Sequence, residues 1–167
     1  MVDLAVDFGM INADNIEQLK KINEACFPVT YKPSFYDDMA KKQDENLCKF
    51  AYFNGFAVGA ICTRIEAIPD CPGRNRIYIM TLGVLAAYRN HGIGSKLVSS
   101  VLDYIESEKN GKFSTVDEIM LHVQTSNVDA INFYEGKFGF RKGELVENYY
   151  KRIDPPHCYI LRKEISR

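Results

Sequence analysis

The sequence predicts a single α/β domain over residues 1–167. Two local patterns carry this prediction. An apolar run over 77–85 is typical of a buried strand, and it leads through a glycine-containing turn into a segment with helical spacing. Asn54-Gly55, flanked by two apolar runs, is the strongest short signal for a β-hairpin. With the remaining elements, the predicted order is β-α-α-β-β-β-α-β-α-β-β.

The first elements are expected to be one strand and two helices. Leu4–Phe8 alternates as a strand does, and Asn12 or Asp14 can cap the helix that follows. The apolar face of that helix would be formed by Ile16, Leu19, Ile22 and Cys26. Phe27-Pro28 ends it, and a second helix is expected over Pro33–Met39, because proline suits the first helical turn.

The middle of the chain is expected to form three strands. Leu47–Phe53 and Phe56–Ile65 flank the hairpin turn. Glu66–Arg76 contains two prolines and a glycine and is expected to be a loop. The apolar segment Ile77–Val84 then forms a buried strand, which we expect at the centre of the sheet.

The last elements continue the alternation of helix and strand. Helices are expected over Ile93–Ser107 and Asn127–Phe138, and a strand over Ile119–Gln124 lies between them. Tyr149–Ile153 and Cys158–Ile165 are expected to form a final strand pair around two adjacent prolines.

Composition excludes several classes of partner. The 167 residues carry a formal net charge of −1, so no broad basic surface is expected to bind nucleic acid. The five cysteines are scattered without metal-type spacing, which favours a reduced intracellular compartment and predicts no metal site. No apolar run approaches the length of a bilayer span, and no secretory signal is visible. We therefore expect a cytoplasmic protein, with a nuclear location left open.

The turn before the predicted helix at residue 93 is the candidate ligand site. It reads Arg89-Asn90-His91-Gly92-Ile93-Gly94. Glycines let backbone N–H groups approach a ligand closely, and a helix N-terminus favours an anion, so the segment can cradle a pyrophosphate. The glycine spacing fits neither a P-loop nor a dinucleotide-binding turn. The alternative is a turn that binds no ligand.

Tyr78 and His122 are the candidates for proton transfer. Tyr78 lies on the same face of its strand as Met80, and His122 on the same face as Met120 and Gln124. If the two strands are neighbours, both side chains can face one groove. Histidine suits a base by its pKa, whereas tyrosine, with a pKa of about 10, would act best through an ordered water. The alternative is that both are packed strand residues without a chemical role.

Two further groups of residues fit a ligand site. Asn127, Ala130 and Tyr134 share one helical face, and the tyrosine could protonate a leaving thiolate. The segment Phe27-Pro28-Val29-x-Tyr31 is a proline-stiffened aromatic loop which, with Tyr149-Tyr150, could line a pocket for an apolar side chain. Packing of a helix on the sheet, and of two helices on each other, are the structural alternatives.

These motifs carry a resemblance to a known family. The Arg-x-x-Gly-x-Gly turn resembles the acetyl-CoA signature of the GNAT acetyltransferases, and the element order is similar to their fold, a mixed sheet with splayed central strands. Five segments together resemble the catalytic subunits of NatE N-terminal acetyltransferases: Phe27-Pro28-Val29-x-Tyr31, Ala51-Tyr52-Phe53-Asn54, Tyr78-Ile79-Met80-Thr81-Leu82-Gly83, Leu121-His122-Val123-Gln124 and Asn148-Tyr149-Tyr150-Lys151-Arg152-Ile153.

The resemblance implies direct acetyl transfer from acetyl-CoA to the N-terminal amine of peptides that keep an initiator Met followed by an apolar residue. Tyr78 and His122 would remove the proton through water. The cofactor-binding residues it implies are Leu82, Gly83, Val84, Arg89, Asn90, His91, Gly92, Ile93, Gly94, Asn127 and Tyr134. The acceptor-binding residues are Phe27, Pro28, Val29, Tyr31, Tyr78, Met80, Tyr149 and Tyr150. It also implies association with a larger N-terminal acetyltransferase complex on the ribosome.

Two other functions stay open at this point. The chain could be a CoA-binding, mainly non-catalytic subunit, although the presence of both Tyr78 and His122 argues against this. It could instead acetylate lysine or small amines, although the apolar Phe27–Tyr31 loop favours a peptide. One departure from the family pattern concerns structure: an extra residue precedes Gly139-Phe140, which leaves the end of that helix open.

Overall fold

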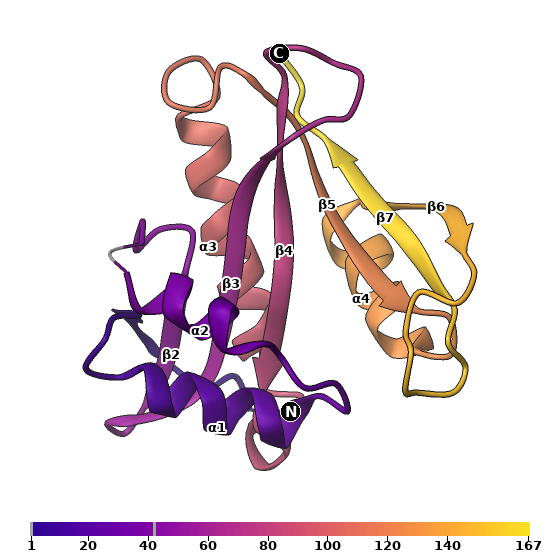
Figure 1. Cartoon of the computed structure of the whole chain (residues 1–167). Coiled ribbons are helices and arrows are strands. Elements are labelled where there is room, and N and C mark those ends of the chain that lie inside the picture. The colour runs from indigo at the N-terminus through magenta and orange to yellow at the C-terminus, as the bar shows by residue number, and fades with distance from the viewer. Residues whose placement is uncertain (1, 42) are drawn as a thin grey trace. The chain divides into compact units, whose positions relative to one another are not determined.

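A computed structural model describes residues 2–41 and 43–167, and its elements follow the predicted order (Figure 1). The strands are β1 (Asp7–Met10), β2 (Lys49–Phe53), β3 (Phe56–Ala67), β4 (Asn75–Val84), β5 (Val116–Gln124), β6 (Arg141–Val146) and β7 (Cys158–Glu164). The helices are α1 (Ile16–Cys26), α2 (Pro33–Ala40), α3 (Ile93–Ser107) and α4 (Val128–Phe138), with a 3-10 turn η1 at Ala86–Tyr88. The order of the strands by hydrogen bonding is β1-β2-β3-β4-β5-β7-β6.

The sheet is mixed, as predicted. Strands β4 and β5 pair in parallel, whereas β1–β2, β2–β3, β5–β7 and β6–β7 pair antiparallel. The chain divides into two compact units, of which unit 1 comprises Met1–Arg64 with Met80–Glu108, and unit 2 comprises Ile65–Ile79 with Lys109–Arg167. The single domain over residues 1–167 stays a prediction. Within the described part of the chain, no helix combines the length and apolar character needed to cross a membrane.

Unit 1 has helices on both faces of its strands (Figure 1). Helices α1 and α2 cover one face, where Leu19 and Ile22 of α1 pack with Phe50 of β2 in a buried cluster. Lys49 precedes Phe50 and therefore points to the opposite face, where its Nζ donates to Ser100 Oγ of α3 at 2.9 Å. The alternation along β2 thus assigns one face to α1 and α2 and the other to α3.

The beginning of unit 1 differs from the prediction in two respects. Strand β1 begins at Asp7, not at Leu4, because the Leu4 backbone bonds elsewhere: its N–H donates to His91 O at 3.1 Å, and its carbonyl accepts from Lys96 Nζ at 2.6 Å. The N-cap of α1 is Asn15, where we expected Asn12 or Asp14. Asn12 Oδ1 instead accepts from the Asp14 N–H at 2.9 Å.

The hairpin forms at the predicted turn. Asn54 and Gly55 have φ values of 49° and 81°, and Phe53 pairs with Phe56 across them. Two positive φ values in a two-residue loop match the twist of the flanking strands, and Asn-Gly accommodates them with little strain. The loop expected at Glu66–Arg76 is shorter than predicted, because β3 continues to Ala67 and β4 begins at Asn75.

Unit 2 is built from β5, β6 and β7 with the first part of β4. The prediction of a strand at Tyr149–Ile153 is wrong, since the partner of β7 is β6 at Arg141–Val146. The backbone of the expected strand lies in a loop, where the Tyr150 N–H donates to Pro156 O at 2.9 Å. Helix α4 runs through the extra residue to Phe138 and ends at Gly139, whose φ of 70° is the left-handed conformation typical of a helix C-cap.

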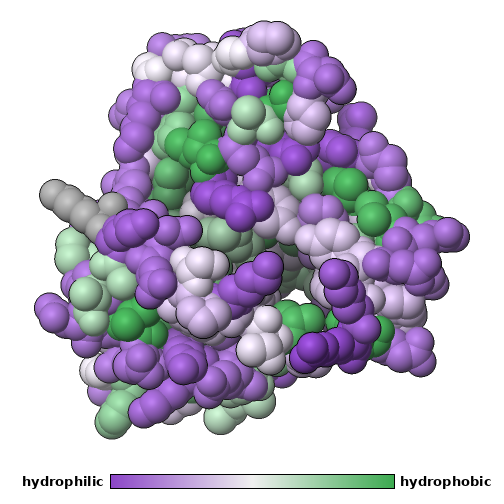
Figure 2. Space-filling model, in the orientation of Figure 1, coloured by the Kyte–Doolittle hydropathy of each residue, from purple (hydrophilic) through white to green (hydrophobic). Residues whose placement is uncertain are grey.

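Several large hydrophobic residues of the described chain are exposed. The face shown in Figure 2 is largely hydrophilic, with hydrophobic residues in small separate groups. The exposed large hydrophobic residues are Val2, Phe8, Met10, Phe56, Ile65, Val128, Leu145 and Tyr149. Tyr149 is the one among them that the sequence places in the candidate site.

Candidate functional site

Tyr78 and His122 meet in unit 2, as the alternation pattern predicted. Strands β4 and β5 are neighbours, with Tyr78 in register with Met120. His122 lies two residues beyond Met120 on the same face, and the Tyr78 hydroxyl is hydrogen-bonded to His122 Nδ1 at 2.7 Å. A tyrosine and a histidine at this distance can pass a proton between them without rearrangement of the backbone.

Tyr149 covers the histidine, a contact that sequence reasoning did not anticipate. Its ring stacks on that of His122, with 4.4 Å between centroids and 12° between planes. Tyr150 packs edge-on against Tyr149 at 5.0 Å, and burial raises the pKa of Tyr150 to about 12. The predicted pair Tyr149-Tyr150 therefore lies beside the predicted base.

The surroundings of His122 keep its ring uncharged at neutral pH. Burial lowers its pKa below the ordinary value, and the positive charge of Arg76 lowers it further, with an opposing contribution from Glu66. Arg76 belongs to a row of alternating charges. Its Nε lies 2.7 Å from Glu66 Oε1, and its Nη1 lies 3.8 Å from Glu118 Oε1. The other carboxylate oxygen of Glu118, Oε2, lies 3.5 Å from Arg162 Nε. A neutral imidazole can accept a proton, as a base must.

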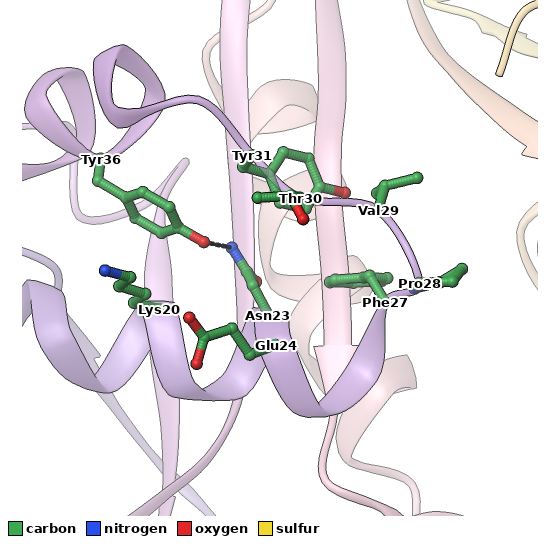
Figure 3. A pocket seen from close by; sticks show the side chains of 9 residues that line it. All are labelled: Lys20, Asn23, Glu24, Phe27, Pro28, Val29, Thr30, Tyr31 and Tyr36. Atoms are coloured by element: carbon green, nitrogen blue, oxygen red, sulfur yellow. Dashed lines mark hydrogen bonds between the residues drawn. The ribbon is translucent and has the colours of Figure 1, made fainter. Parts of the chain in front are cut away.

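In unit 1, the predicted acceptor loop lines a cavity of about 180 Å³ (Figure 3). All four of its predicted residues take part: Phe27, Pro28, Val29 and Tyr31. The rings of Phe27 and Tyr31 meet edge to face at 6.0 Å and 83°. The loop is therefore a cavity wall, and not only a packing contact between α1 and α2.

The other wall of this cavity is polar and was missed by the sequence reasoning. Lys20, Asn23 and Glu24 of α1 line it, together with Thr30 and Tyr36. Figure 3 shows Asn23 and Tyr36 joined by a hydrogen bond, which the Asn23 side-chain amide donates over 3.3 Å. The expectation of an apolar lining is thus only partly right. The missed signal was the helical spacing of 20, 23, 24 and 27, which puts these residues on one face.

The end of β4 packs directly against this loop. A Cβ atom on Gly83 would lie 3.2 Å from Phe27 Cζ and 3.3 Å from Cys26 Sγ, so glycine permits the close approach of α1. The carbonyl of the next residue, Val84, accepts from Arg89 Nε at 2.8 Å and from Cys26 Sγ at 3.4 Å. Within unit 1, the backbone predicted to bind a cofactor is therefore adjacent to the wall of the acceptor cavity.

The turn into α3 has the conformation expected of an anion cradle. Asn90 and Gly92 have φ values of 63° and 80°, and no side chain caps the helix N-terminus. No capping side chain therefore occupies the backbone N–H groups at the start of α3. These groups, with the positive end of the helix dipole, suit the binding of a pyrophosphate. Asp3 lies beside this turn, with its Oδ1 3.2 Å from Lys96 Nζ and against the position that a Cβ on Gly92 would take.

The remaining predicted residues have structural contacts of their own. Asn127 is the N-cap of α4, where its Oδ1 accepts from the Ala130 N–H at 3.1 Å. Tyr134 is buried against Phe140, and burial raises its pKa. Met80 lines a second cavity in unit 1, of about 340 Å³. Ligand contacts of these residues stay predictions.

Comparison with known proteins identifies the family. The profile of the acetyltransferase (GNAT) family matches residues 16–140. The chain belongs to this family. It is 46% identical over 160 residues to N-alpha-acetyltransferase 50 of Danio rerio, covering 96% of this chain and 89% of that protein. It is 41% identical over 167 residues to the probable N-acetyltransferase san of Drosophila melanogaster, covering 100% and 85%.

A solved relative confirms the predicted fold. The structure of Arabidopsis thaliana Naa50 in complex with the bisubstrate analogue CoA-Ac-MVNAL is 42% identical in sequence and superposes with a TM-score of 0.82. The match covers 97% of this chain and all of that chain. The GNAT fold inferred from the element order and the Arg-x-x-Gly-x-Gly turn is therefore correct.

Proposed function

We propose that this chain is an acetyl-CoA-dependent N-terminal acetyltransferase whose preferred acceptors are peptides that begin with Met and an apolar residue. The observation that carries the proposal is the hydrogen bond between Tyr78 and a His122 ring whose pKa is lowered. Membership of the GNAT family and the likeness to relatives named as N-alpha-acetyltransferases support the reaction class.

Tyr78 and His122 act together on the proton of the acceptor amine. When neutral His122 carries its proton on Nε2, the Tyr78 hydroxyl donates to Nδ1. The phenol oxygen can then take a proton from the amine, directly or through a water, while its own proton passes to Nδ1. Neither residue needs to hold a charge before the reaction, and direct transfer requires no covalent enzyme intermediate.

The cavity at Phe27 is proposed to receive the side chain of the initiator Met. Phe27, Pro28 and Val29 offer an apolar wall for its thioether chain. Glu24 on the polar wall can accept a hydrogen bond from a backbone N–H of the acceptor. The presence of this carboxylate keeps an amine-specific activity open as the alternative, since an ammonium group could pair with it.

Acetyl-CoA would supply the acetyl group as an activated thioester. The glycine turn at Gly92 and the N-terminus of α3 are proposed to bind its pyrophosphate, with the backbone of Leu82–Val84 beside the acetyl arm. Arg89 already bonds to Val84 O, so it orders the end of β4 for that contact. We further propose that the protein acts in the cytoplasm, or also in the nucleus, with a larger acetyltransferase complex and the ribosome.

Turnover of acetyl-CoA by the isolated protein on a panel of acceptors tests this function. The panel comprises a Met-Leu peptide, the same peptide beginning with Ser or Ala, an N-terminally blocked peptide with an internal lysine, and a polyamine. We expect acetylation of the Met-Leu peptide to dominate. Preferred turnover of the lysine or the polyamine would favour the amine-specific alternative. Acetyl-CoA binding without any turnover would favour a non-catalytic subunit.

A further inference from the structure

The loop 147–157 is tied together by a histidine that the proposed reaction does not use. The backbone N–H of Asn148 donates to His157 Nδ1 at 3.0 Å. The carbonyl of His157 accepts from the Thr125 N–H at the end of β5, also at 3.0 Å. The imidazole therefore joins the first turn of the loop to a backbone position that is itself fixed to β5.

The turn held in this way determines the direction of Tyr149. Asn148 has a φ of 54°, the left-handed conformation that few residues other than Gly and Asn adopt readily. Tyr149 follows directly, and its ring lies on His122. Tyr149 is still 42% exposed, although Tyr150 packs edge-on against its ring and the Tyr150 N–H is bonded to Pro156 O. The hydrogen bond from Asn148 to His157 is thus a separate constraint on the Tyr149 backbone.

We propose that His157 is a positioning residue: by accepting the Asn148 N–H, it holds the Tyr149 ring over the His122 imidazole. The inference rests on the proposed function in so far as His122 is the base. The far end of the loop does not depend on the His157 side chain, since Gln124 Nε2 donates to Pro155 O at 2.9 Å. Loss of the imidazole should therefore release the Asn148 turn while the other end stays attached.

The stacked Tyr149 ring has a chemical consequence for His122. It shields one face of the imidazole from water, and burial is the largest cause of the lowered pKa of His122. If the ring moves away, hydration favours the charged form and the pKa rises toward its ordinary value. The charged groups that act on His122 from the adjoining strands are Arg76 on β4, Glu66 on β3 and Arg162 on β7. Glu118 on β5 pairs with both arginines, and Tyr78 on β4 is hydrogen-bonded to the imidazole. None of them is altered by a change at His157.

Asparagine and leucine provide a matched pair of variants. Asn carries Oδ1 on Cγ, where His carries Nδ1, and can accept the same hydrogen bond. Leu has a similar shape but no acceptor. His157→Asn should therefore preserve the position of Tyr149, and His157→Leu should not. His157→Ala provides a second variant without an acceptor, and thermal melts establish that each variant is folded.

NMR of the His122 ring protons tests the proposal without reference to activity. The Tyr149 ring current shifts these resonances, and Tyr149→Leu calibrates its complete loss. We expect His157→Leu and His157→Ala to move the His122 ring-proton resonances toward their position in Tyr149→Leu. His157→Asn should leave these resonances near their wild-type position. Equal shifts in all three His157 variants would show that ring packing matters and not the acceptor. No shift in any of them would show that His157 does not position Tyr149. Either result would overturn the proposal.

Kinetics provide the second readout. With a Met-Leu peptide, kcat/KM should fall about 3- to 10-fold in His157→Leu, the range expected for one neutral hydrogen bond, and recover in His157→Asn. The acid limb that belongs to the enzyme should move to higher pH in His157→Leu and His157→Ala, and stay in place in His157→Asn. Equal kinetics of the Leu and Asn variants would contradict the proposal. If the wild-type protein acetylates no peptide, the proposed function fails, and the NMR comparison still decides the role of His157.

Discussion

Replacement of Phe27 by Ala tests the choice of acceptor most directly. Phe27 ends α1, and its ring forms part of the wall of the 180 Å³ cavity, edge-on to Tyr31. Loss of the ring opens the cavity to water beside the position proposed for the Met side chain. It leaves the pair Tyr78 and His122 unchanged, so we expect selectivity to change more than chemistry.

The expected size follows from the burial of the acceptor side chain. Complete burial of a Met side chain is worth about 1.5–3 kcal/mol, or roughly 10- to 150-fold in preference over Ser. Phe27 is one of four apolar or aromatic residues on the apolar wall of the cavity. The edge-to-face contact of its ring with Tyr31 stabilises the loop by about 0.5–1.5 kcal/mol. We therefore expect Phe27→Ala to remove about 1–2 kcal/mol of discrimination, roughly 5- to 30-fold in the preference.

The assay compares kcat/KM for two peptides that differ only in Met or Ser at the first position. Their ratio is independent of the fraction of active enzyme, so partial unfolding of a variant does not distort it. Phe56→Ala is the control, because Phe56 is 70% exposed and lines neither cavity of unit 1. An unchanged ratio in Phe27→Ala, with both rates reduced equally, would refute the assignment of the cavity. So would a wild-type ratio near one.

Four further predictions concern the base and the cofactor turn. Tyr78→Phe and His122→Gln should each lower kcat by roughly 100-fold or more, with acetyl-CoA affinity by calorimetry unchanged. Because the pKa of His122 is lowered and its neutral form is required, the limb of the wild-type kcat/KM profile that belongs to the enzyme should lie below about 6.5, apart from the limb that the free acceptor α-amine gives at about 7.7–8.0. An enzyme limb above about 6.5 that is lost in His122→Gln would contradict a buried base. Gly92→Ala forces a Cβ at φ 80°, so it should cost about 1–2 kcal/mol in chemical denaturation and weaken CoA binding. Asp3→Asn removes a negative charge beside this turn and should tighten CoA binding a few-fold at low salt. Asp7→Asn is the control and should leave CoA affinity unchanged. Equal effects of the two variants would argue against a contact between Asp3 and the bound CoA.

The parts of the fold that could be predicted are those set by local sequence. The β4–turn–α3 unit follows from an apolar run, two glycines and helical spacing, all within 77–107. The Asn54-Gly55 turn is equally local. Strand β6 could not be found, because Arg141–Val146 is a largely exposed strand with three charged residues and little alternation. Its pairing depends on β7, and not on any pattern of its own.

The error at Tyr149–Ile153 has the opposite origin. Adjacent tyrosines favour a strand, and the sequence offered no sign that they are used otherwise. In the structure Tyr149 stacks on a histidine from β5, a contact between residues 27 positions apart that depends on a left-handed Asn148. Tyr149 and Tyr150 could be named as candidates from the sequence, but the way in which the loop presents them could not.

The prediction of the Tyr78–His122 pair succeeded because it needed only one assumption about tertiary structure. Alternation gives the face of each residue, and adjacency of β4 and β5 then brings the two side chains together. What alternation cannot give is the charge state of the imidazole, which depends on Arg76 and Glu66 and on the covering Tyr149. These groups come from three different elements, and they decide whether the pair can act as a base. The contact between Tyr78 and His122 can therefore be derived from strand geometry, whereas the protonation of the imidazole requires the folded structure around it.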